Sequence, residues 1–538
     1  MGEAKAVSLS QGMMEDLIIR GGLVVDGSGA PGRRADVMVN GGLISGIGNY
    51  QDAVEAVDAR RILDASGMVV APGFIDCHAH SDLSFLQDDS CASKLYQGIT
   101  TEISGNCGDS PFPAPPVRRP AEDEWHLASF DRFVRKFEEG GYKMGTHQVM
   151  LIGHGTLRAD VMGLEDRTPT PAELDQMKAL LRRDLADGAW GMSLGLEYAP
   201  GFFADVDELA ELGKVVKEFD GFLPCHMRSE GLKIDEALQE LIEVGRRSGA
   251  HVHVSHLKID NYRVHGRARE VWERIEAARR SGISITADLY PYTASSTTLS
   301  IRCPSWSLEG GAEKLVERLQ GERRGEILES IRSHYFNAER AETCLISDDA
   351  GYWPEIVGKT LRAVAEELLD TTDYAEAAAE ILVRTHGRAW CIFFVMSEAD
   401  MLYFLSQETA IGSDGSALSG DPGKVSGHPH PRYFGAIDEF FRLNRVHHFC
   451  TLEEAVRRVT SLPAEYVGLK RRGLLKAGMA ADITVFDPET IAPRSTYQDP
   501  VQLPGGVRHV VIDGMVALEN GVQTDVRAGR FLRKTEEG

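Results

Sequence analysis

The sequence of 538 residues lacks three features that would indicate a secreted or membrane-bound protein. Its eight cysteines are scattered without a Cys-x-x-Cys pair, so a disulfide framework is not expected and a reducing compartment fits better. No run of about 18 apolar residues occurs, so no segment is expected to span a membrane. Glu3, Lys5 and Gln11 break up the first apolar stretch, and we expect no signal peptide. These absences predict a cytoplasmic protein.

Basic residues are too few to balance the acidic ones. The chain has 58 lysines and arginines against 81 aspartates and glutamates, which gives a net charge of −23. Such a surface repels phosphate backbones and anionic membranes, so we expect neither nucleic acid nor a membrane as a partner. An anionic small molecule would need a local basic pocket. The length predicts one large domain with a smaller one, and composition leaves open whether the chain forms a homo-oligomer.

Segments of strand character, separated by Gly-rich breaks, lie at both ends of the chain. Those near the N-terminus cover residues 16–20, 22–26, 36–40 and 43–47. Those near the C-terminus cover residues 482–487 and 507–514. The two ends therefore predict a small β-sandwich domain assembled from residues 14–70 and 466–530.

Residues 71–465 alternate between short strands and amphipathic helices, for example at 234–248 and 267–281. This alternation predicts an α/β fold, the closed (β/α)8 TIM-like barrel. Its strands are expected at residues 68–77, 100–104, 147–153, 188–194, 221–225, 251–256, 283–289 and 409–413. The stretch 303–395 is too long for one connection, so we expect an insertion with its own helices, for example at 313–319 and 359–369.

The C-terminal ends of the expected barrel strands carry residues that can bind a metal, and such barrels place their chemistry there. Strand one ends in His78-Ala79-His80, and because residues i and i+2 point to the same side, both imidazoles can reach one metal. Other strand ends supply a thiolate, two imidazoles and a carboxylate: Cys107, His226, His256 and Asp414. Imidazole and thiolate together favour zinc over magnesium or calcium. One such residue alone is more often a core residue, so the metal hypothesis depends on the joint pattern.

The remaining histidines and cysteines are given ordinary structural roles. His251 and His253 are expected to face the surrounding helices, and His447 and His448 the solvent. Three cysteines are expected to be apolar filler: Cys77, Cys225 and Cys303. His154, at the end of strand three, is equally compatible with a substrate contact and with a core position.

Several motifs resemble those of the D-aminoacylase (N-acyl-D-amino-acid deacylase) family. Residues 72–80 resemble the first-strand signature of the amidohydrolase superfamily, with the sequence Pro72-Gly-Phe-Ile-Asp-Cys-His-Ala-His. The narrower family is indicated by Gly98-Ile-Thr-Thr-Glu-Ile-Ser-Gly-Asn-Cys-Gly, His226-Met-Arg-Ser-Glu, Ser255-His-Leu-Lys, Tyr290-Pro-Tyr-Thr-Ala, and Gly412-Ser-Asp-Gly followed by His430-Pro-Arg. The similarity extends from about residue 14 to residue 520.

Strand four contains no lysine, which separates this chain from most of the superfamily. Most relatives use a carboxylated lysine on that strand to bridge two metals, whereas in the D-aminoacylase family a cysteine from strand two does so. Cys107 stands at the matching position. The resemblance thus implies that Cys107, His226 and His256 hold one tightly bound zinc. A second, weaker position would be lined by His78, His80 and Asp414.

The resemblance also implies catalytic roles. Zinc can bring the pKa of its bound water to about 7, and Asp414 would accept the water's proton and deliver it to the leaving nitrogen. Tyr198 matches the family tyrosine that donates to the scissile carbonyl oxygen. Glu197 is a rival candidate for the bridging ligand.

Three further positions match the family residues that bind the substrate's α-carboxylate: Lys258, Tyr290 and Arg432. Arginine offers a bidentate fork, lysine a point charge and tyrosine a neutral donor. The loop between Asp414 and His430 is longer than in typical members, which leaves the position of Arg432 open. Arg302 could pair with a D-Glu or D-Asp side chain, but an apolar wall is suggested by Ile301, Pro304 and Trp306. We favour a broad or apolar specificity.

The implied function is zinc-dependent hydrolysis of N-acyl-D-amino acids to a carboxylate and a free D-amino acid. The partner would be a small molecule, an N-acyl amino acid or a dipeptide. A peptidase for L-Xaa-D-Xaa dipeptides could use the same site. A hydantoinase-like or dihydroorotase-like hydrolase of cyclic amides is disfavoured by the missing strand-four lysine. A scaffold protein that lost its metal is disfavoured because all six candidate ligands are present.

Overall fold

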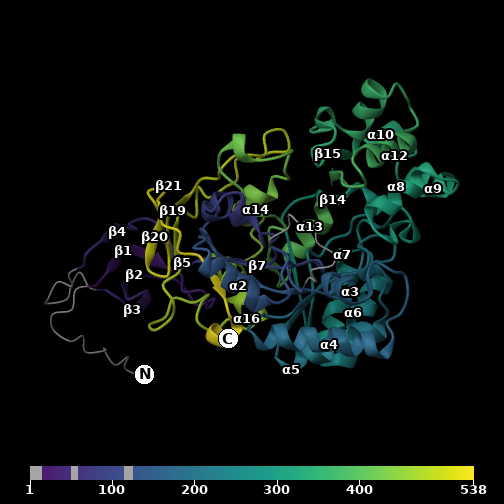
Figure 1. Cartoon of the computed structure of the whole chain (residues 1–538). Helices are drawn as coiled ribbons and strands as arrows, with labels where there is room; N and C mark the ends of the chain where they lie inside the picture. Colours follow the sequence, from purple (N-terminus) through teal and green to yellow (C-terminus); the bar gives the residue numbers. More distant parts are fainter. Residues whose placement is uncertain (1–14, 50–58, 114–124) are drawn as a thin grey trace.

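Strands from both ends of the chain form one sheet of nine strands. The computed structural model describes residues 15–49, 59–113 and 125–538, so residue 14, the expected start of the β domain, lies outside the described residues. Figure 1 shows the N-terminal and C-terminal strands side by side. The sheet comprises β1 (Leu17–Val24), β2 (Arg33–Asn40), β3 (Leu43–Gly48), β4 (Ile62–Asp64), β5 (Val69–Pro72), β18 (Ile483–Phe486), β19 (Val507–Ile512), β20 (Met515–Glu519) and β21 (Val522–Gln523).

The two chain ends meet where β5 pairs with β18 in antiparallel orientation. Alternate residues of these strands, among them Val70, Ile483 and Val485, belong to a buried core of their own. Residues 16–20 and 22–26, which we expected as two strands, instead form the single strand β1. A register shift between Ile19 and Gly22 takes up the glycines without ending the strand.

Parallel strands in the middle of the chain follow a closed path. In order of pairing they are β6 (Phe74–Asp76), β7 (Ile99–Ser104), β8 (His147–Met150) with β9 (Ile152–Gly153), β10 (Met192–Gly195), β11 (Phe222–His226), β12 (His251–Val254), β13 (Ile285–Leu289) and β17 (Ala410–Ile411). Leu151 joins β8 to β9, and its N–H donates to the carbonyl of Ser104. A parallel bridge between Ala79 and Gly415 returns the path from the end of β17 to the end of β6. This path has the strand order of the predicted barrel.

Helices surround this ring of strands: α2 (Phe130–Glu139), α3 (His154–Met162), α4 (Pro171–Ala186), α5 (Val206–Glu218), α6 (Ile234–Ser248), α7 (Ala268–Arg280), α13 (Glu398–Leu405), α14 (Arg432–His447), α15 (Leu452–Arg458) and α16 (Ser461–Val467). Their starts are encoded locally. Thr170 and Glu173, for example, form a capping box ahead of α4. No helix among the described residues is long and apolar enough to cross a membrane.

The inward face of β12 is polar, which corrects one expectation. His253 donates from Nε2 to Asp288 Oδ2 at 2.7 Å, and His251 Nε2 lies 2.8 Å from Thr286 Oγ1. The alternate residues Val252 and Val254 instead pack in the core that the helices share. The prediction that these histidines face the helices is therefore wrong. Both faces of a barrel strand are buried, and the interior accepts imidazoles because Thr286 and Asp288 satisfy them.

An insertion with a separate core lies between β13 and β17. Its antiparallel sheet contains β14 (Ser295–Thr298), β15 (Cys344–Asp348) and β16 (Trp390–Phe393). Its helices include α8 (Ala312–Gln320), α9 (Arg324–His334), α10 (Ala338–Glu342), α11 (Leu361–Ala363) and α12 (Tyr374–Arg384). The insertion projects from the barrel at the upper right of Figure 1. Its sheet begins at Ser295, earlier than residue 303, where we expected the insertion to start. The sequence did not predict this strand, because the Ser- and Thr-rich β14 lacks hydrophobic alternation.

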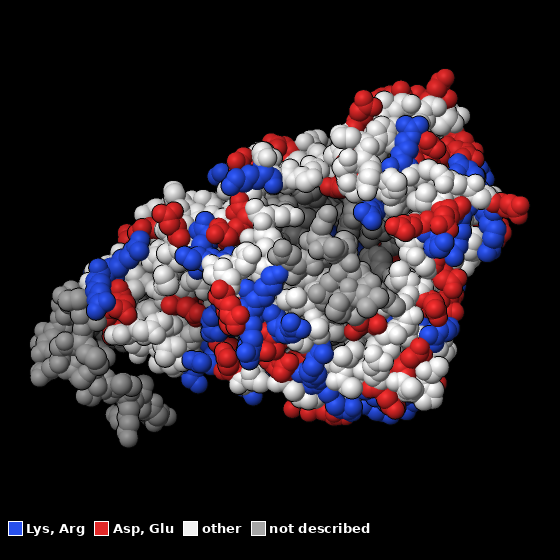
Figure 2. All heavy atoms as spheres, in the orientation of Figure 1, with Lys and Arg blue, Asp and Glu red and all other residues white. Residues whose placement is uncertain are grey.

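Acidic and basic side chains are interleaved on the face of the molecule that Figure 2 shows. On that face the net charge of −23 is not gathered into one large acidic patch. An anion could therefore bind inside the cavity, where cationic side chains are separated from the acidic groups of the surface.

Candidate functional site

A cavity of about 1180 Å³ lies at the C-terminal ends of the barrel strands and extends to the insertion. Loops that follow the barrel strands line its floor. The insertion supplies part of its wall through β14, Arg302 and Phe393. Of the sequence-predicted site residues, the following line it: His80, Cys107, Tyr198, His226, His256, Lys258, Tyr290, Arg302, Asp414 and Arg432. Only His78 among the predicted residues lies just beneath this surface, and it is fully buried.

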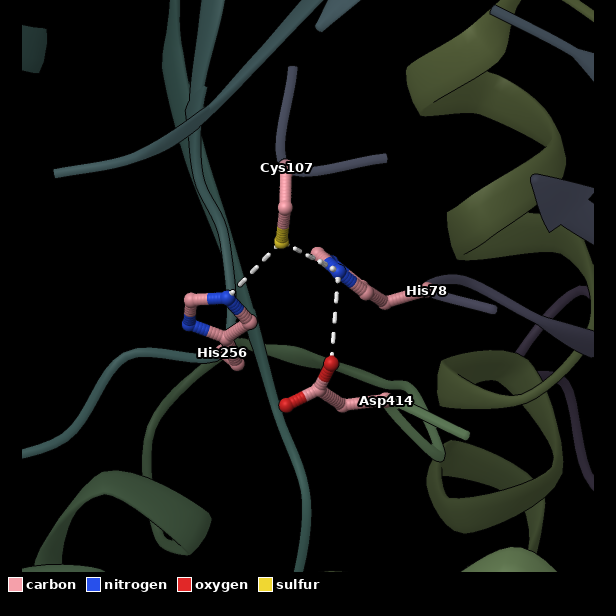
Figure 3. Close-up of side chains that lie close together, drawn as sticks. All are labelled: His78, Cys107, His256 and Asp414. Carbon is pink, nitrogen blue, oxygen red and sulfur yellow. Dashed lines mark hydrogen bonds and ion pairs between the residues drawn. The ribbon is translucent and has the colours of Figure 1, made fainter. Parts of the chain in front are cut away.

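Four potential metal ligands converge on one point (Figure 3). Sγ of Cys107 lies 3.4 Å from Nε2 of His78 and 3.4 Å from Nε2 of His256. Nε2 of His78 lies 3.7 Å from Oδ1 of Asp414, and all four ligand atoms are within 4.8 Å of one another. His80 joins from the rim, with Nε2 at 3.1 Å from the same Asp414 oxygen.

A left-handed backbone turns three of these side chains toward the cavity. The φ angles are 53° at Cys107, 36° at His256 and 48° at Asp414. Such values are uncommon for residues other than glycine, and they cluster at functional sites. Gly108 follows Cys107 with φ of 79°, and a Cβ there would lie 2.7 Å from the backbone nitrogen of Gly195. The Asn-Cys-Gly sequence therefore needs its glycine to bring the thiol to the cavity.

His226 lies beside this group. Its ring centroid is 4.6 Å from that of His256, and its Nε2 contacts Oε2 of Glu197 at 2.8 Å. Its Nδ1 is buried and has no hydrogen-bond partner among the described residues. Burial, with help from the Lys258 ammonium, lowers the pKa of His226 to about 4, so the ring is neutral and can act as a ligand. Glu197, the rival bridging candidate, touches His226 and lies outside the four-atom group.

Asp414 is ionised and paired. Its Oδ2 lies 2.9 Å from Nη1 of Arg432. Burial alone would raise the pKa of Asp414, but the guanidinium of Arg432 and the neighbouring imidazoles hold it well below its usual value. The backbone N–H of Arg432 donates to Nδ1 of His430 at 3.0 Å. Arg432, which the sequence left unplaced, thus starts α14 inside the cavity.

Lys258, Tyr290 and Arg432 surround a common volume. The cationic groups of Lys258 and Arg432 lie 5.7 Å and 4.6 Å from the centroid of the Tyr290 ring. Burial raises the pKa of Tyr290 to about 12, so its hydroxyl is a neutral donor. Two cations and one neutral donor are groups that can donate to a carboxylate. In this structure Lys258 is paired with Glu230 and Arg432 with Asp414.

Tyr198 connects the barrel to the insertion, and Arg302 belongs to the insertion's own part of the cavity wall. The hydroxyl of Tyr198 lies 3.0 Å from Oγ1 of Thr297 on β14, and its ring is 4.7 Å from that of His226. The guanidinium of Arg302 lies 4.5 Å from the ring centroid of Phe393. The insertion therefore helps to shape the cavity close to the metal-type residues.

His154 has a structural environment. Its Nε2 contacts Oε1 of Glu208 at 2.8 Å, and Arg158 pairs with the other oxygen of Glu208. His154 is fully buried, and the cavity lining includes the adjacent Gly155 but not His154. The structure thus gives it a core position.

Three residues of the site escaped the sequence reasoning. Glu230, the last residue of His226-Met-Arg-Ser-Glu, contacts both His256 and Lys258. Asp288, at the end of β13, accepts from the backbone N–H of His256 at 2.9 Å and lies 3.5 Å from Nδ1 of His78. The position of Glu230 inside a recognised motif was a usable signal. Asp288, two residues before Tyr290 at the end of strand seven, was another usable signal.

The third is Lys94, which is fully buried beneath the site. Its Nζ donates to Oδ2 of Asp76 at 2.8 Å, to Oγ of Ser413 at 2.6 Å and to the carbonyl of Gly415 at 2.9 Å. It thereby ties the strand that carries His78 to the turn that carries Asp414. No sequence pattern marks this lysine.

Comparison with known proteins identifies the family of this chain. A family model described as "Amidohydrolase family" matches residues 61–316 and 419–517. D-aminoacylase of Alcaligenes xylosoxydans xylosoxydans is 33% identical over 98% of this chain and 100% of the relative. N-acyl-D-glutamate deacylase of the same organism is 33% identical over 96% of each.

Solved structures add the fold. The crystal structure of N-acyl-D-glutamate deacylase from Bordetella bronchiseptica, complexed with zinc and a phosphonate inhibitor, has a TM-score of 0.81 and 32% identity and covers 97% of this chain and 100% of that one. The predicted family and fold class are thereby confirmed. The chain belongs to the amidohydrolase family and, within it, to the D-aminoacylase group.

Proposed function

We propose that this enzyme hydrolyses the amide bond of N-acyl-D-amino acids with zinc as its metal. One observation carries the proposal: a cluster of thiol, imidazole and carboxylate groups lies at the same cavity as two cations and a tyrosine hydroxyl. These two parts match the two ends of such a substrate, the acyl carbonyl and the α-carboxylate. The relatives named for D-amino acids or their N-acyl derivatives support the D configuration.

The donor set fits zinc. A thiolate among imidazoles is the ligand combination that zinc prefers. Nδ1 of His226, buried without a hydrogen-bond partner among the described residues, is a further nitrogen donor. We assign the tight position to Cys107, His226 and His256, and the weaker one to His78, His80 and Asp414. Bound there, zinc would supply Lewis acidity and make hydroxide available near neutral pH.

The chain's own groups perform the remaining steps. Asp414, ionised and pointing at the cluster, accepts a proton from the attacking water and then delivers it to the amide nitrogen, a poor leaving group without protonation. Tyr198 donates its hydroxyl hydrogen to the acyl oxygen as charge develops there. The α-carboxylate is held by Lys258, Tyr290 and Arg432.

Anchoring two groups of the substrate makes the site stereoselective. With the carbonyl and the carboxylate both fixed, the α-carbon can direct its side chain into the open part of the cavity in one configuration only. The expected result is turnover of N-acetyl-D-amino acids and essentially none of their L enantiomers. Equal rates for both enantiomers would contradict the assigned carboxylate pocket and leave the metal assignment standing.

The side chain of the amino acid is the open part of the specificity. We propose a broad or apolar preference, because Ile301 and Phe393 line the cavity near Arg302. D-Glu or D-Asp is a second candidate, favoured by the buried Nε of Arg302, which no described group satisfies. Kinetics on a panel of N-acetyl-D-amino acids decides between them. L-Xaa-D-Xaa dipeptides and hydantoins belong in the same panel, since they test the other two activities.

Metal analysis tests the cofactor. Protein purified without added metal should contain about one zinc per chain, with the second position filled only partly. Cys107→Ala should lose both zinc and activity, because the soft ligand common to the cluster is removed. Two equally tight metals in the wild type, or none, would contradict the assignment. Cys450→Ala, a thiol remote from the cavity lining, serves as the matched control.

A further inference from the structure

We propose that Glu230 is the positioning residue that couples the metal centre to the carboxylate pocket, an inference that rests on the proposed function. Its two carboxylate oxygens contact one residue of each. Oε1 lies 3.0 Å from Nδ1 of His256, and Oε2 lies 2.5 Å from Nζ of Lys258. One side chain therefore holds both a proposed metal ligand and a proposed substrate-binding cation.

The surroundings of Glu230 restrict it to this arrangement. The residue is 2% exposed, and its carbonyl accepts the N–H of Asp260 at 3.0 Å. A Cβ on the adjacent Gly231 would lie 2.6 Å from Oδ1 of Asp260. The loops that follow β11 and β12 are thus packed against each other, and the carboxylate has little freedom to turn away from its partners.

Glu230 determines which nitrogen of His256 carries the proton. Nε2 of His256 lies 3.4 Å from Sγ of Cys107, so it is the nitrogen that can reach a metal in the cluster. It can bind only through a lone pair, which requires the proton to be on Nδ1. A carboxylate only accepts hydrogen bonds, so Oε1 of Glu230 keeps the proton on Nδ1.

Lys258 would favour the opposite tautomer. Its Nζ lies 2.9 Å from Nδ1 of His256, and an ammonium only donates. Without the Glu230 carboxylate, Lys258 would donate to Nδ1 from this position and displace the ring proton to Nε2, where it blocks the metal. Glu230 prevents this by accepting from the ammonium through one oxygen and from the imidazole through the other. The same ion pair fixes Lys258 beside Tyr290.

Glu230→Gln tests the coupling, because it keeps the size of the side chain and removes its charge. Zinc affinity should fall about 10–100-fold, as for other groups that orient metal-bound histidines. KM for N-acetyl-D-amino acids should rise as well, since Lys258 loses its anchor. Zinc affinity is measured on the metal-free protein by competition with a chromophoric chelator, and KM and kcat are measured separately on the zinc-loaded protein.

Glu208→Gln is the matched control. Glu208 is also 2% exposed and also pairs with a histidine and a cation, but away from the cavity. It should keep wild-type zinc affinity and KM, although both variants lose some thermal stability. Wild-type zinc affinity in a folded Glu230→Gln protein, or an equal loss in Glu208→Gln, would overturn the proposal. If Glu230→Gln fails to fold, Glu230→Asp replaces it, since it keeps the charge but shortens the reach, and it should bind zinc more weakly than the control.

A second substitution separates the tautomer argument from simple loss of packing. Adding Lys258→Met to Glu230→Gln removes the competing ammonium, so part of the lost zinc affinity should return while KM stays high. No recovery of affinity would contradict the role given to Lys258. These zinc measurements need no turnover. They therefore still test Glu230 if the wild-type protein binds zinc but leaves every N-acyl-D-amino acid intact.

Discussion

Two buried carboxylates in this molecule have nearly the same partners and different surroundings. Glu208 joins His154 and Arg158, and Glu230 joins His256 and Lys258. Each carboxylate is 2% exposed, and the oxygen-to-nitrogen distances to the two histidines are 2.8 Å and 3.0 Å. By composition, burial and pairing, neither triad can be distinguished as functional.

The difference lies in what the second nitrogen of each histidine faces. Nε2 of His256 faces the thiol of Cys107 in the cavity, whereas Nδ1 of His154 is buried without a partner in the described part of the chain. All three members of the Glu230 triad line the cavity. A buried charged network is therefore weak evidence of function by itself, and it becomes strong evidence where it converges with metal-type ligands on an open volume.

The largest expected effect belongs to Asp414, which lines the cavity together with the Glu230 triad. Asp414→Asn keeps the shape of the side chain and removes the base, and because this group acts twice, kcat should fall by about 10⁴-fold, the top of the range for acid–base catalysts. Zinc at the tight position should remain, since its three proposed ligands are intact. Rapid-quench or steady-state assays with parallel zinc analysis provide the measurement. Near-normal turnover would show that the base lies elsewhere.

Two buried arginines, Arg432 beside Asp414 in the cavity and Arg158 beside Glu208, should differ in a similar way. Arg432→Lys should reduce kcat/KM for N-acetyl-D-amino acids nearly as much as Arg432→Ala, at a cost on the order of 2–5 kcal/mol, because an ammonium cannot supply the bidentate fork. The α-amide of the same substrate should be poor for the wild type. Arg158→Lys should lower the melting temperature and leave kcat/KM unchanged. If the wild type had the same kcat/KM for the α-amide as for the free acid, the proposed carboxylate pocket would be wrong.

The sequence was informative where function depends on local pattern. His78 and His80 share one side of a strand end, and Cys107, His256 and Asp414 each follow a recognisable strand, so their convergence could be expected from the barrel alone. The two-ended β domain could be anticipated too, because its strands are short, apolar and separated by glycines. In these cases the information lies within a few residues of each position.

The sequence was uninformative where contacts are distant or burial is two-sided. Lys94 reaches Ser413 across a separation of 319 residues, and nothing near either residue records the contact. His251 and His253 were misplaced because both faces of a barrel strand are buried, so alternation does not identify the interior face. Glu230 lay within a recognised motif, but its two contacts depend on how the loops after β11 and β12 pack.

Glu208→Gln should have the smallest effect on catalysis, and it tests the comparison of the two triads most directly. Removing one partner from a buried ion pair costs about 3–5 kcal/mol of stability, so the melting temperature should fall while kcat stays at the wild-type value. Burial would raise the pKa of Glu208, but His154 and Arg158 hold it below its ordinary 4.5. The carboxylate's contribution is therefore complete above pH 4.5 and is lost as pH falls through the lower, folded-state value. The melting temperatures of the wild type and of Glu208→Gln, measured from pH 7 downward, should differ most at neutral pH and converge in acid. A gap that stays constant with pH would mean that packing, and not charge, makes Glu208 matter. A loss of kcat at neutral pH would mean that the second triad is coupled to the cavity after all.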